Sequence, residues 1–356
     1  MLHRHPRRVL VPCPLFVVLA LVLGACGSSS KSSSPASGTP SGGSNSVTLR
    51  LGYFPNVTHA PAIIGVASGK FRSALGSNVR LELETFNSGS EATTAILAGA
   101  LDASFVGPNP AINAYQKTSG KVRIVAGTAL GGAYLVVKPS INSAADLKGK
   151  KVASPQLGNT QDVALRTWLN SQGLHETKTG GDVTIVPEEN AVTLTAFQQG
   201  AIQGAWVPEP WATRLVNEGG GKVLVDEATL WPQGKYETTV LLVTTKFLTD
   251  HRDVVKSLIS GLADSLDLVK SNPAQAKGLT GTGIKSVTGK ALKPALIDAS
   301  FRHITFTLDP AASSLTTSAE HAKALGFLKS SDLGSIVDLS LLDEVLRARG
   351  QPAIPS

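Results

Sequence analysis

Cysteine is almost absent from this sequence, and its two cysteines both lie near the amino terminus. Cys13 belongs to a segment with a basic head and a short apolar core, which is expected to be cleaved off. The mature chain would then keep Cys26 alone, and a single thiol cannot form a disulfide within the chain. The sequence therefore excludes a disulfide-stabilised scaffold and thiolate catalysis, and it leaves anchoring as the role of Cys26.

A large excess of charge of one sign is also lacking. The 356 residues include 33 Lys and Arg against 26 Asp and Glu, a net charge of +7. Removal of residues 1–25 would take away three arginines and no acid, which leaves a net charge of +4. The basic residues form no stripe of the kind that nucleic-acid-binding surfaces carry. We therefore expect no nucleic-acid partner, whereas a small positive charge suits an anionic ligand.

Familiar catalytic motifs are missing. The sequence contains no Gly-x-Ser-x-Gly, His-Glu-x-x-His or Cys-x-x-Cys motif. Gly283–Lys290 resembles a phosphate-binding loop only superficially, because it has one residue too many between the glycines and lacks the final Ser or Thr. The histidines beyond residue 25 are scattered without metal-ligand spacing: His59, His175, His251, His303 and His321. We expect no catalysis, no cofactor and no metal site.

The amino terminus contains a targeting pattern. An apolar core, Leu15–Leu23, follows the basic head and is too short to span a bilayer comfortably. Leu23–Cys26 resembles the lipobox of bacterial lipoproteins, which implies cleavage before Cys26 and a lipid on its sulfur. Residues 1–25 are then a signal peptide, and residues 26–46, rich in Ser, Gly and Pro, form a tether to the outer side of the cell membrane. The alternative is a signal peptide cleaved upstream of an ordinary cysteine.

A repeat organises the rest of the chain. Ala95–Gly107 returns about a hundred residues later as Ala196–Pro208, with glycine, a branched apolar residue, an aromatic residue and valine in matching places. Each copy reads as the end of a helix, a glycine at its C-terminal position and a short strand. Each strand is expected to run into a proline-bearing turn. Two similar α/β lobes follow from this repeat, with chance similarity of two αβ units as the alternative.

The expected lobes are discontinuous in sequence. Strands alternating with helices predict parallel sheets covered on both faces. Two extended apolar runs, Gly131–Val137 and Glu237–Thr244, bracket the second copy and are predicted to cross between the lobes. The first lobe is then 47–132 with 240–356, the second is 133–239, and the C-terminal helices pack on the first. Two crossings predict a hinge of two segments.

The binding site is expected where strands end and helices begin, because ligands of open α/β sheets bind beyond the carboxyl ends of the strands. The turns at these places are rich in Gly, Ser, Asn and Thr and contain no Lys or Arg. A helix N-terminus can bind an anion without a cationic side chain. The predicted ligand-binding residues are Phe54, Asn56, His59, Ser88, Gly89, Ser90, Asn109, Gly132, Gly158, Asn159, Thr160, Gln161, Trp206 and Glu209.

Four of these residues have competing interpretations. Asn159 is equally suited to capping the helix that follows it. Trp206 lies on a strand, where core packing is as reasonable as ligand contact. Glu209 would repel a bare anion but could pair with the ammonium group of a zwitterion, and the competing interpretation is a solvated surface acid. For His59, a supporting or surface position competes with direct contact.

Four segments together resemble the solute-binding lipoproteins of bacterial ABC importers, in the branch that takes up aliphatic sulfonates, taurine and nitrate. The segments are Gly52–His59, Ala98–Asp102 with Val106–Pro110, Ser154–Val163 and Ala205–Trp211. The resemblance implies the type II periplasmic-binding-protein fold, with two Rossmann-like lobes joined by a two-segment hinge. It also implies delivery of the solute to a membrane permease driven by a separate ATPase.

The sequence therefore predicts an extracytoplasmic, membrane-tethered, monomeric receptor for a small anionic solute, and we expect an aliphatic sulfonate. Nitrate, taurine or a pyrimidine precursor of thiamine are alternatives within the same role. A lipid-anchored enzyme that uses the same cleft is the alternative from another class.

Overall fold

The computed structural model describes residues 46–354, and within them the chain forms two α/β lobes. The first lobe contains β1 (Val47–Tyr53), η1 (Val57–His59), α1 (Ala60–Ala67), α2 (Lys70–Leu75), β2 (Val79–Thr85), α3 (Gly89–Leu97), β3 (Ala103–Val106), α4 (Pro108–Lys117) and β4 (Val122–Gly131). It resumes with β10 (Glu237–Thr244), α8 (Thr245–Asp250), α9 (Arg252–Ser271), α10 (Pro273–Thr288), α11 (Pro294–Arg302), β11 (Ile304–Phe306), α12 (Ala312–Ala324) and α13 (Ser340–Ala348).

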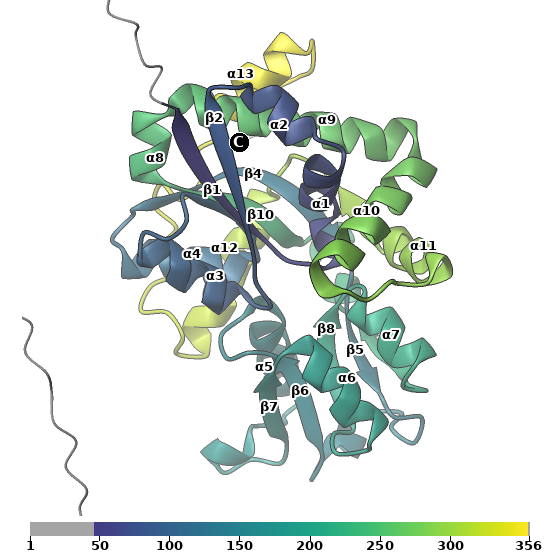
Figure 1. Cartoon of the computed structure of the whole chain (residues 1–356). Coiled ribbons are helices and arrows are strands. Elements are labelled where there is room, and N and C mark those ends of the chain that lie inside the picture. The colour runs from purple at the N-terminus through teal and green to yellow at the C-terminus, as the bar shows by residue number, and fades with distance from the viewer. Residues whose placement is uncertain (1–45, 355–356) are drawn as a thin grey trace, which may run out of the picture. The chain divides into compact units, whose positions relative to one another are not determined.

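The second lobe lies between β4 and β10 in the sequence. It contains β5 (Ala133–Val137), η2 (Ala144–Leu147), β6 (Lys151–Pro155), α5 (Thr160–Ser171), η3 (Thr177–Thr179), β7 (Thr184–Glu188), α6 (Asn190–Gln198), β8 (Gly204–Pro208), α7 (Trp211–Asn217), β9 (Lys222–Asp226), η4 (Glu227–Leu230) and η5 (Pro232–Gly234). Figure 1 shows α5 and α6 beside strands β6, β7 and β8 of this lobe.

The two sheets share one plan. The first has the order β11-β4-β10-β3-β1-β2 and the second has the order β7-β6-β8-β5-β9. In each, three parallel strands (β2, β1, β3 or β7, β6, β8) are followed by an antiparallel strand, β10 or β5. Parallel neighbours need helical crossovers, and these place helices on the faces of a sheet. The predicted pair of α/β lobes is therefore confirmed.

The sequence repeat corresponds to equivalent elements of the two sheets. In the first lobe, α3 ends at Leu97, Gly99 has φ +73°, and β3 follows. In the second lobe, α6 ends at Gln198, Gly200 has φ +76°, and β8 follows. Glycine adopts this left-handed conformation without the steric penalty of a side chain, so it ends both helices.

Two short crossings join the lobes. Gly131, the last residue of β4, pairs with Ile304 in the first sheet, whereas Ala133 already pairs with Pro208 in the second. The second crossing leads back to the first lobe and ends at Glu237, which pairs with Leu130 of the first sheet. Residues 237–239, which the sequence analysis assigned to the second lobe, therefore belong to the first sheet.

Apolar side chains cover both faces of each sheet. On the first sheet, one buried cluster includes Phe71 of α2 and Leu262 of α9, and the other includes Ile96 of α3 and Leu315 of α12. The second sheet has its own two clusters, one beneath α5 and one beneath α6 and α7. The C-terminal helices pack on the first lobe as expected, since α9 and α13 contribute to its core.

One predicted turn is wrong. A proline-bearing turn was expected after the strand of the first repeat copy, but α4 begins at Pro108, directly after Gly107. Proline has no amide hydrogen, and the first turn of a helix does not need one, so two prolines fit there. Gly107 is consequently the N-cap of α4.

Candidate functional site

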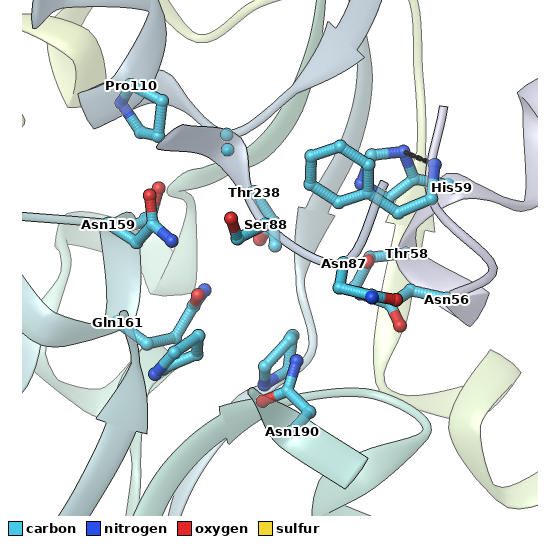
Figure 2. A pocket seen from close by; sticks show the side chains of 16 residues that line it. Asn56, Thr58, His59, Asn87, Ser88, Pro110, Asn159, Gln161, Asn190 and Thr238 are labelled. Carbon is cyan, nitrogen blue, oxygen red and sulfur yellow. Dashed lines mark hydrogen bonds between the residues drawn. The ribbon is translucent and has the colours of Figure 1, made fainter. Parts of the chain in front are cut away.

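One polar pocket is lined by residues from both lobes. It encloses about 410 Å³ of empty space, part of it open to solvent. The first lobe contributes the residues after β1, β2 and β3 together with Thr238 of β10, and the second contributes those after β6 and β7 together with Pro208. Figure 2 shows Ser88, Asn159, Gln161 and Asn190 around one open space. The pocket lies at the strand ends, where the sequence analysis expected it.

Eight of the predicted ligand-binding residues line this pocket. They are Phe54, Asn56, His59, Ser88, Gly89, Asn159, Thr160 and Gln161. The sequence analysis missed Thr58, Asn87, Gly107, Pro110, Pro155, Asn190, Pro208 and Thr238. The repeat could have revealed Asn190, because it begins the helix after β7 much as Ser88 caps the helix after β2. Nothing in the sequence marks Thr238 as a pocket residue, since it lies on strand β10 between Glu237 and Thr239 and not in a turn between a strand and a helix.

The other predicted residues do not line the pocket. Ser90 and Gly158 line a separate cavity beside α3 and α4. The amide of Asn109 donates a hydrogen bond of 3.1 Å to the carbonyl of Ser318. Gly132 forms part of the first crossing, where its carbonyl accepts a hydrogen bond from the amide of Glu209.

Trp206 belongs to the core of the second lobe. It is fully buried, and its indole ring lies 5.9 Å from that of Trp168. The indole Nε1–H donates a 2.7 Å hydrogen bond to the carboxylate of Glu227. Burial raises the pKa of Glu227 to about 7, against the lowering effect of that hydrogen bond. The packing interpretation is the one that the structure supports, because strand β8 directs this side chain towards α5 instead of the pocket.

Glu209 is neither a surface acid nor a lining residue. Its carboxylate is fully buried and accepts hydrogen bonds from the amide (3.2 Å) and hydroxyl (2.8 Å) of Thr213 in its own lobe. It also accepts one from Ser300 (3.1 Å) and lies 2.8 Å from Nδ1 of His303 in the first lobe. Glu209 raises the pKa of His303 through this contact. Glu209 therefore links the lobes, and no oxygen of it is left for a solute.

The beginnings of α3 and α5 are in direct contact across the two lobes. The hydroxyl of Ser88 donates a 2.6 Å hydrogen bond to Oε1 of Gln156, and Nε2 of Gln156 donates 2.9 Å to Glu91. Ser90 lies 3.1 Å from Oδ1 of Asn159. Asn159 occupies the N-cap position of α5, but its side chain makes no capping hydrogen bond within the described residues. The capping interpretation of Asn159 is therefore wrong for the side chain.

Helix N-termini line the pocket, and cationic side chains do not, within the described part of the chain. Among residues 46–354, none of the lining side chains is acidic or basic apart from His59. The N-termini of α3, α4, α5 and α6 all contribute lining residues. A helix N-terminus presents unpaired N–H groups and roughly half a positive charge, although Pro108 and Pro110 supply no N–H group in the first turn of α4. Four of them together create a positive potential that suits a small oxyanion.

Two lining side chains carry polar atoms without a partner. Oγ1 of Thr160 and Oδ1 of Asn190 are buried, and neither makes a hydrogen bond within the described part of the chain. Thr160 is 7 % exposed and Asn190 is 6 % exposed, and both are the first residues of their helices. A buried polar atom without a partner is costly, and where it lines a pocket a bound group can supply the partner. The Thr160 hydroxyl can donate or accept a hydrogen bond, whereas Oδ1 of Asn190 can only accept one.

His59 lies at the edge of the pocket as a neutral side chain. Its ring stacks on Phe54 at a centroid distance of 4.3 Å, and the amide of Phe54 donates to Nδ1 at 3.4 Å. Burial lowers the pKa of His59 from 6.5 to about 3. It is only 3 % exposed, so the surface position considered from the sequence is wrong.

This burial predicts a loss of stability in acid. Between pH 6.5 and 3 the unfolded chain takes up a proton at His59 that the folded chain does not. The contribution of neutral His59 to the free energy of unfolding is therefore complete above pH 6.5 and decreases as the pH falls below it. We expect about 2 kcal/mol less stability from this group at pH 5 than at pH 7. His59→Phe, which keeps the stacking, should show a correspondingly smaller loss in urea denaturation at the two pH values. His175→Phe, at an exposed position, serves as the control, and equal pH dependence of His59→Phe and the unaltered protein would contradict the assignment.

Residues 46–354 contain neither a candidate membrane span nor a metal-binding cluster. No helix there is long and apolar enough to cross a membrane. No group of three or more His, Cys, Asp or Glu side chains is arranged to hold a metal ion in the same part of the chain.

Two α/β lobes, two crossings and a polar pocket between helix N-termini define the class of two-lobed periplasmic binding proteins. Solved structures with the same fold include the alkanesulfonate-binding protein SsuA from Xanthomonas axonopodis pv. citri bound to MOPS, with a TM-score of 0.69 at 19% identity over 82% of this chain and 98% of that one. Another is the nitrate-binding protein NrtA from Synechocystis PCC 6803, with a TM-score of 0.72 at 17% identity over 85% and 89% of the two chains.

The chain belongs to the NMT1-like family, whose model matches residues 42–281. It is also 29% identical over 214 residues to the taurine-binding periplasmic protein of Escherichia coli (strain K12). That match covers 60% of this chain and 64% of the length of the relative. The resemblance inferred from the sequence motifs is confirmed at the level of family and fold.

Proposed function

We propose that this protein captures a small anionic solute, an aliphatic sulfonate, outside the cytoplasm as the solute-binding component of an ABC importer. The observation that carries the proposal is the unpartnered Thr160 hydroxyl at the N-terminus of α5, in a pocket lined by helix N-termini and without cationic side chains. The unpartnered Oδ1 of Asn190 is an acceptor and would take a hydrogen bond from a donor group of the solute, such as a hydroxyl. The names of the relatives support the same class of solute, since they bind taurine, alkanesulfonates or nitrate.

Closure of the two lobes would supply the binding energy. A sulfonate oxygen at the start of α5 would accept hydrogen bonds from the Thr160 hydroxyl and from backbone N–H groups, in place of water. Exclusion of water lowers the surrounding dielectric and strengthens each of these bonds. The contacts of Ser88 and Glu91 with Gln156 would hold the lobes together around the solute. No step in this cycle requires a catalytic group.

Calorimetric titration of the purified protein tests the proposal. Methanesulfonate, ethanesulfonate and 2-hydroxyethanesulfonate should bind, and Thr160→Ala should weaken binding roughly ten- to a hundredfold, because a hydrogen bond to a charged group contributes about 1.5–3 kcal/mol. Thr167→Ala is the matched control, since Thr167 also lies on α5 and its buried hydroxyl also lacks a partner, but it does not line the pocket. Equal affinities of the two variants would place the site elsewhere.

The alternative solutes and the alternative class give different outcomes in the same experiment. Binding of nitrate or of a thiamine-pyrimidine precursor with no sulfonate binding would keep the receptor role and change the solute. Turnover of a sulfonate by the protein alone would instead support an enzyme that uses this cleft. We expect recovery of the unaltered solute.

The cellular setting belongs to the same proposal. A permease with a separate ATPase would receive the solute, and the receptor would act as a monomer. Cys26, at the end of the lipobox-like segment, would carry the lipid that holds the protein at the outer side of the cell membrane. Cys26, the signal peptide and the tether up to residue 45 lie outside the described residues.

A further inference from the structure

We propose that the pocket selects a monoanionic solute that has no positively charged group and discriminates against zwitterions such as taurine. This inference rests on the proposed function and specifies its solute. It separates this chain from its taurine-binding relative, with which it shares 29% identity over the matched residues.

An ammonium group would find no counter-charge in the pocket. In the described part of the chain, no Asp or Glu side chain lines it. Three carboxylates lie on the surrounding elements, and each already accepts hydrogen bonds from protein donors: Glu91 from Gln156, Asp162 from Ser154, Gly158 and Arg166, and Glu209 from Thr213 and Ser300. A cationic group brought into this site would therefore lose its hydration without gaining an ion pair, which is unfavourable.

Acids next in sequence to lining residues lie outside the pocket, although Oε1 of Glu188 and Oε2 of Glu237 are buried without a hydrogen-bond partner among residues 46–354. Glu188 and Glu189 precede Asn190, and Glu237 precedes Thr238, but none of the three lines the pocket. Burial raises the pKa of Glu188 and raises that of Glu237 well above its ordinary value, so burial favours their neutral forms.

The helix N-termini act in the same direction. The partial positive charges at the starts of α3, α4, α5 and α6 attract an anion, and they repel an ammonium group in the same small space. The side chains opposite α5 and α6 are the neutral amides and hydroxyl of Asn56, Asn87 and Thr58. Such neutral groups can form a hydrogen bond with a hydroxyl of the solute or contact its alkyl tail, but they cannot form an ion pair with an ammonium group.

Two nearly isosteric solutes test the inference by calorimetry at pH 7. Taurine (2-aminoethanesulfonate) carries an ammonium group where 2-hydroxyethanesulfonate carries a hydroxyl. We expect 2-hydroxyethanesulfonate to bind and taurine to bind at least tenfold more weakly. Taurine binding as tight as or tighter than 2-hydroxyethanesulfonate would overturn the inference and leave the proposed receptor function standing.

Asn190→Asp supplies the missing counter-charge at the pocket. An acid in the first turn of α6 is compatible with the helix. This variant should bind 2-hydroxyethanesulfonate more weakly and reduce or reverse its preference over taurine. Asn78→Asp, which adds the same charge at an exposed position before β2, should leave the preference unchanged. An unchanged preference in Asn190→Asp would also count against the inference, whereas failure of every sulfonate to bind the unaltered protein would remove the proposed function and this inference with it.

Discussion

Replacement of Gly107 with alanine is expected to weaken solute binding strongly without disturbing the first lobe. Gly107 has φ −69° and ψ 158°, a conformation that alanine adopts freely. A Cβ atom there would lie 2.4 Å from Oγ1 of Thr160, which belongs to the other lobe. This overlap would oppose the closed arrangement of the lobes. At about 1–3 kcal/mol for such overpacking, binding of 2-hydroxyethanesulfonate should fall roughly 5- to 150-fold.

A double-mutant cycle separates lobe closure from other effects of Gly107→Ala. Without the Thr160 hydroxyl, the nearest atom to the new Cβ at residue 107 is Cβ of residue 160, at an ordinary contact distance of 3.5 Å. In the Thr160→Ala background, Gly107→Ala should therefore cause little further loss of affinity. Calorimetry of the four proteins measures the coupling. Additive losses would show that Gly107 acts through something other than its contact with Thr160.

Replacement of Glu209 with alanine should cause the largest loss of stability. The substitution removes a fully buried carboxylate and leaves Thr213, Ser300 and His303 without their acceptor. Removal of one partner from a buried polar pair costs about 3–5 kcal/mol. Chemical denaturation should show this loss, with Glu218→Ala as the control. Glu218 pairs with Arg214 at the exposed end of α7. We expect its replacement to lower the free energy of unfolding by about 1 kcal/mol or less.

The same substitution should change the pH dependence of stability. Because Glu209 raises the pKa of His303 above 6.5, their contact contributes fully at pH values below 6.5. The contribution is lost as pH rises through the raised pKa of the folded protein. Glu209→Ala should remove this decline on the alkaline side. An unaltered slope would show that His303 titrates independently of Glu209.

Local sequence patterns were sufficient to predict the architecture. Alternating strands and helices predicted parallel sheets, and the repeat around Gly99 and Gly200 predicted two equivalent lobes, because helix periodicity and left-handed glycines are local properties of the chain. The family motifs and the strand-end rule pointed to turns that line a pocket between the lobes. Eight of the predicted residues line the pocket because those turns lie at the carboxyl ends of strands in both sheets.

Which side chains at those turns face the pocket could not be predicted from local patterns, because it depends on the tertiary structure. Trp206 and Glu209 follow one another closely at the end of β8, yet one packs under α5 and the other bonds to α11 of the opposite lobe. Asn190 and Thr238 face the pocket with no local signal as strong as the glycine-rich turns. Partners far apart in the sequence, such as Glu209 with His303 or Gly107 with Thr160, depend on how the lobes are apposed. Local patterns contain no information on that apposition, because it results from packing between segments that are far apart in the sequence.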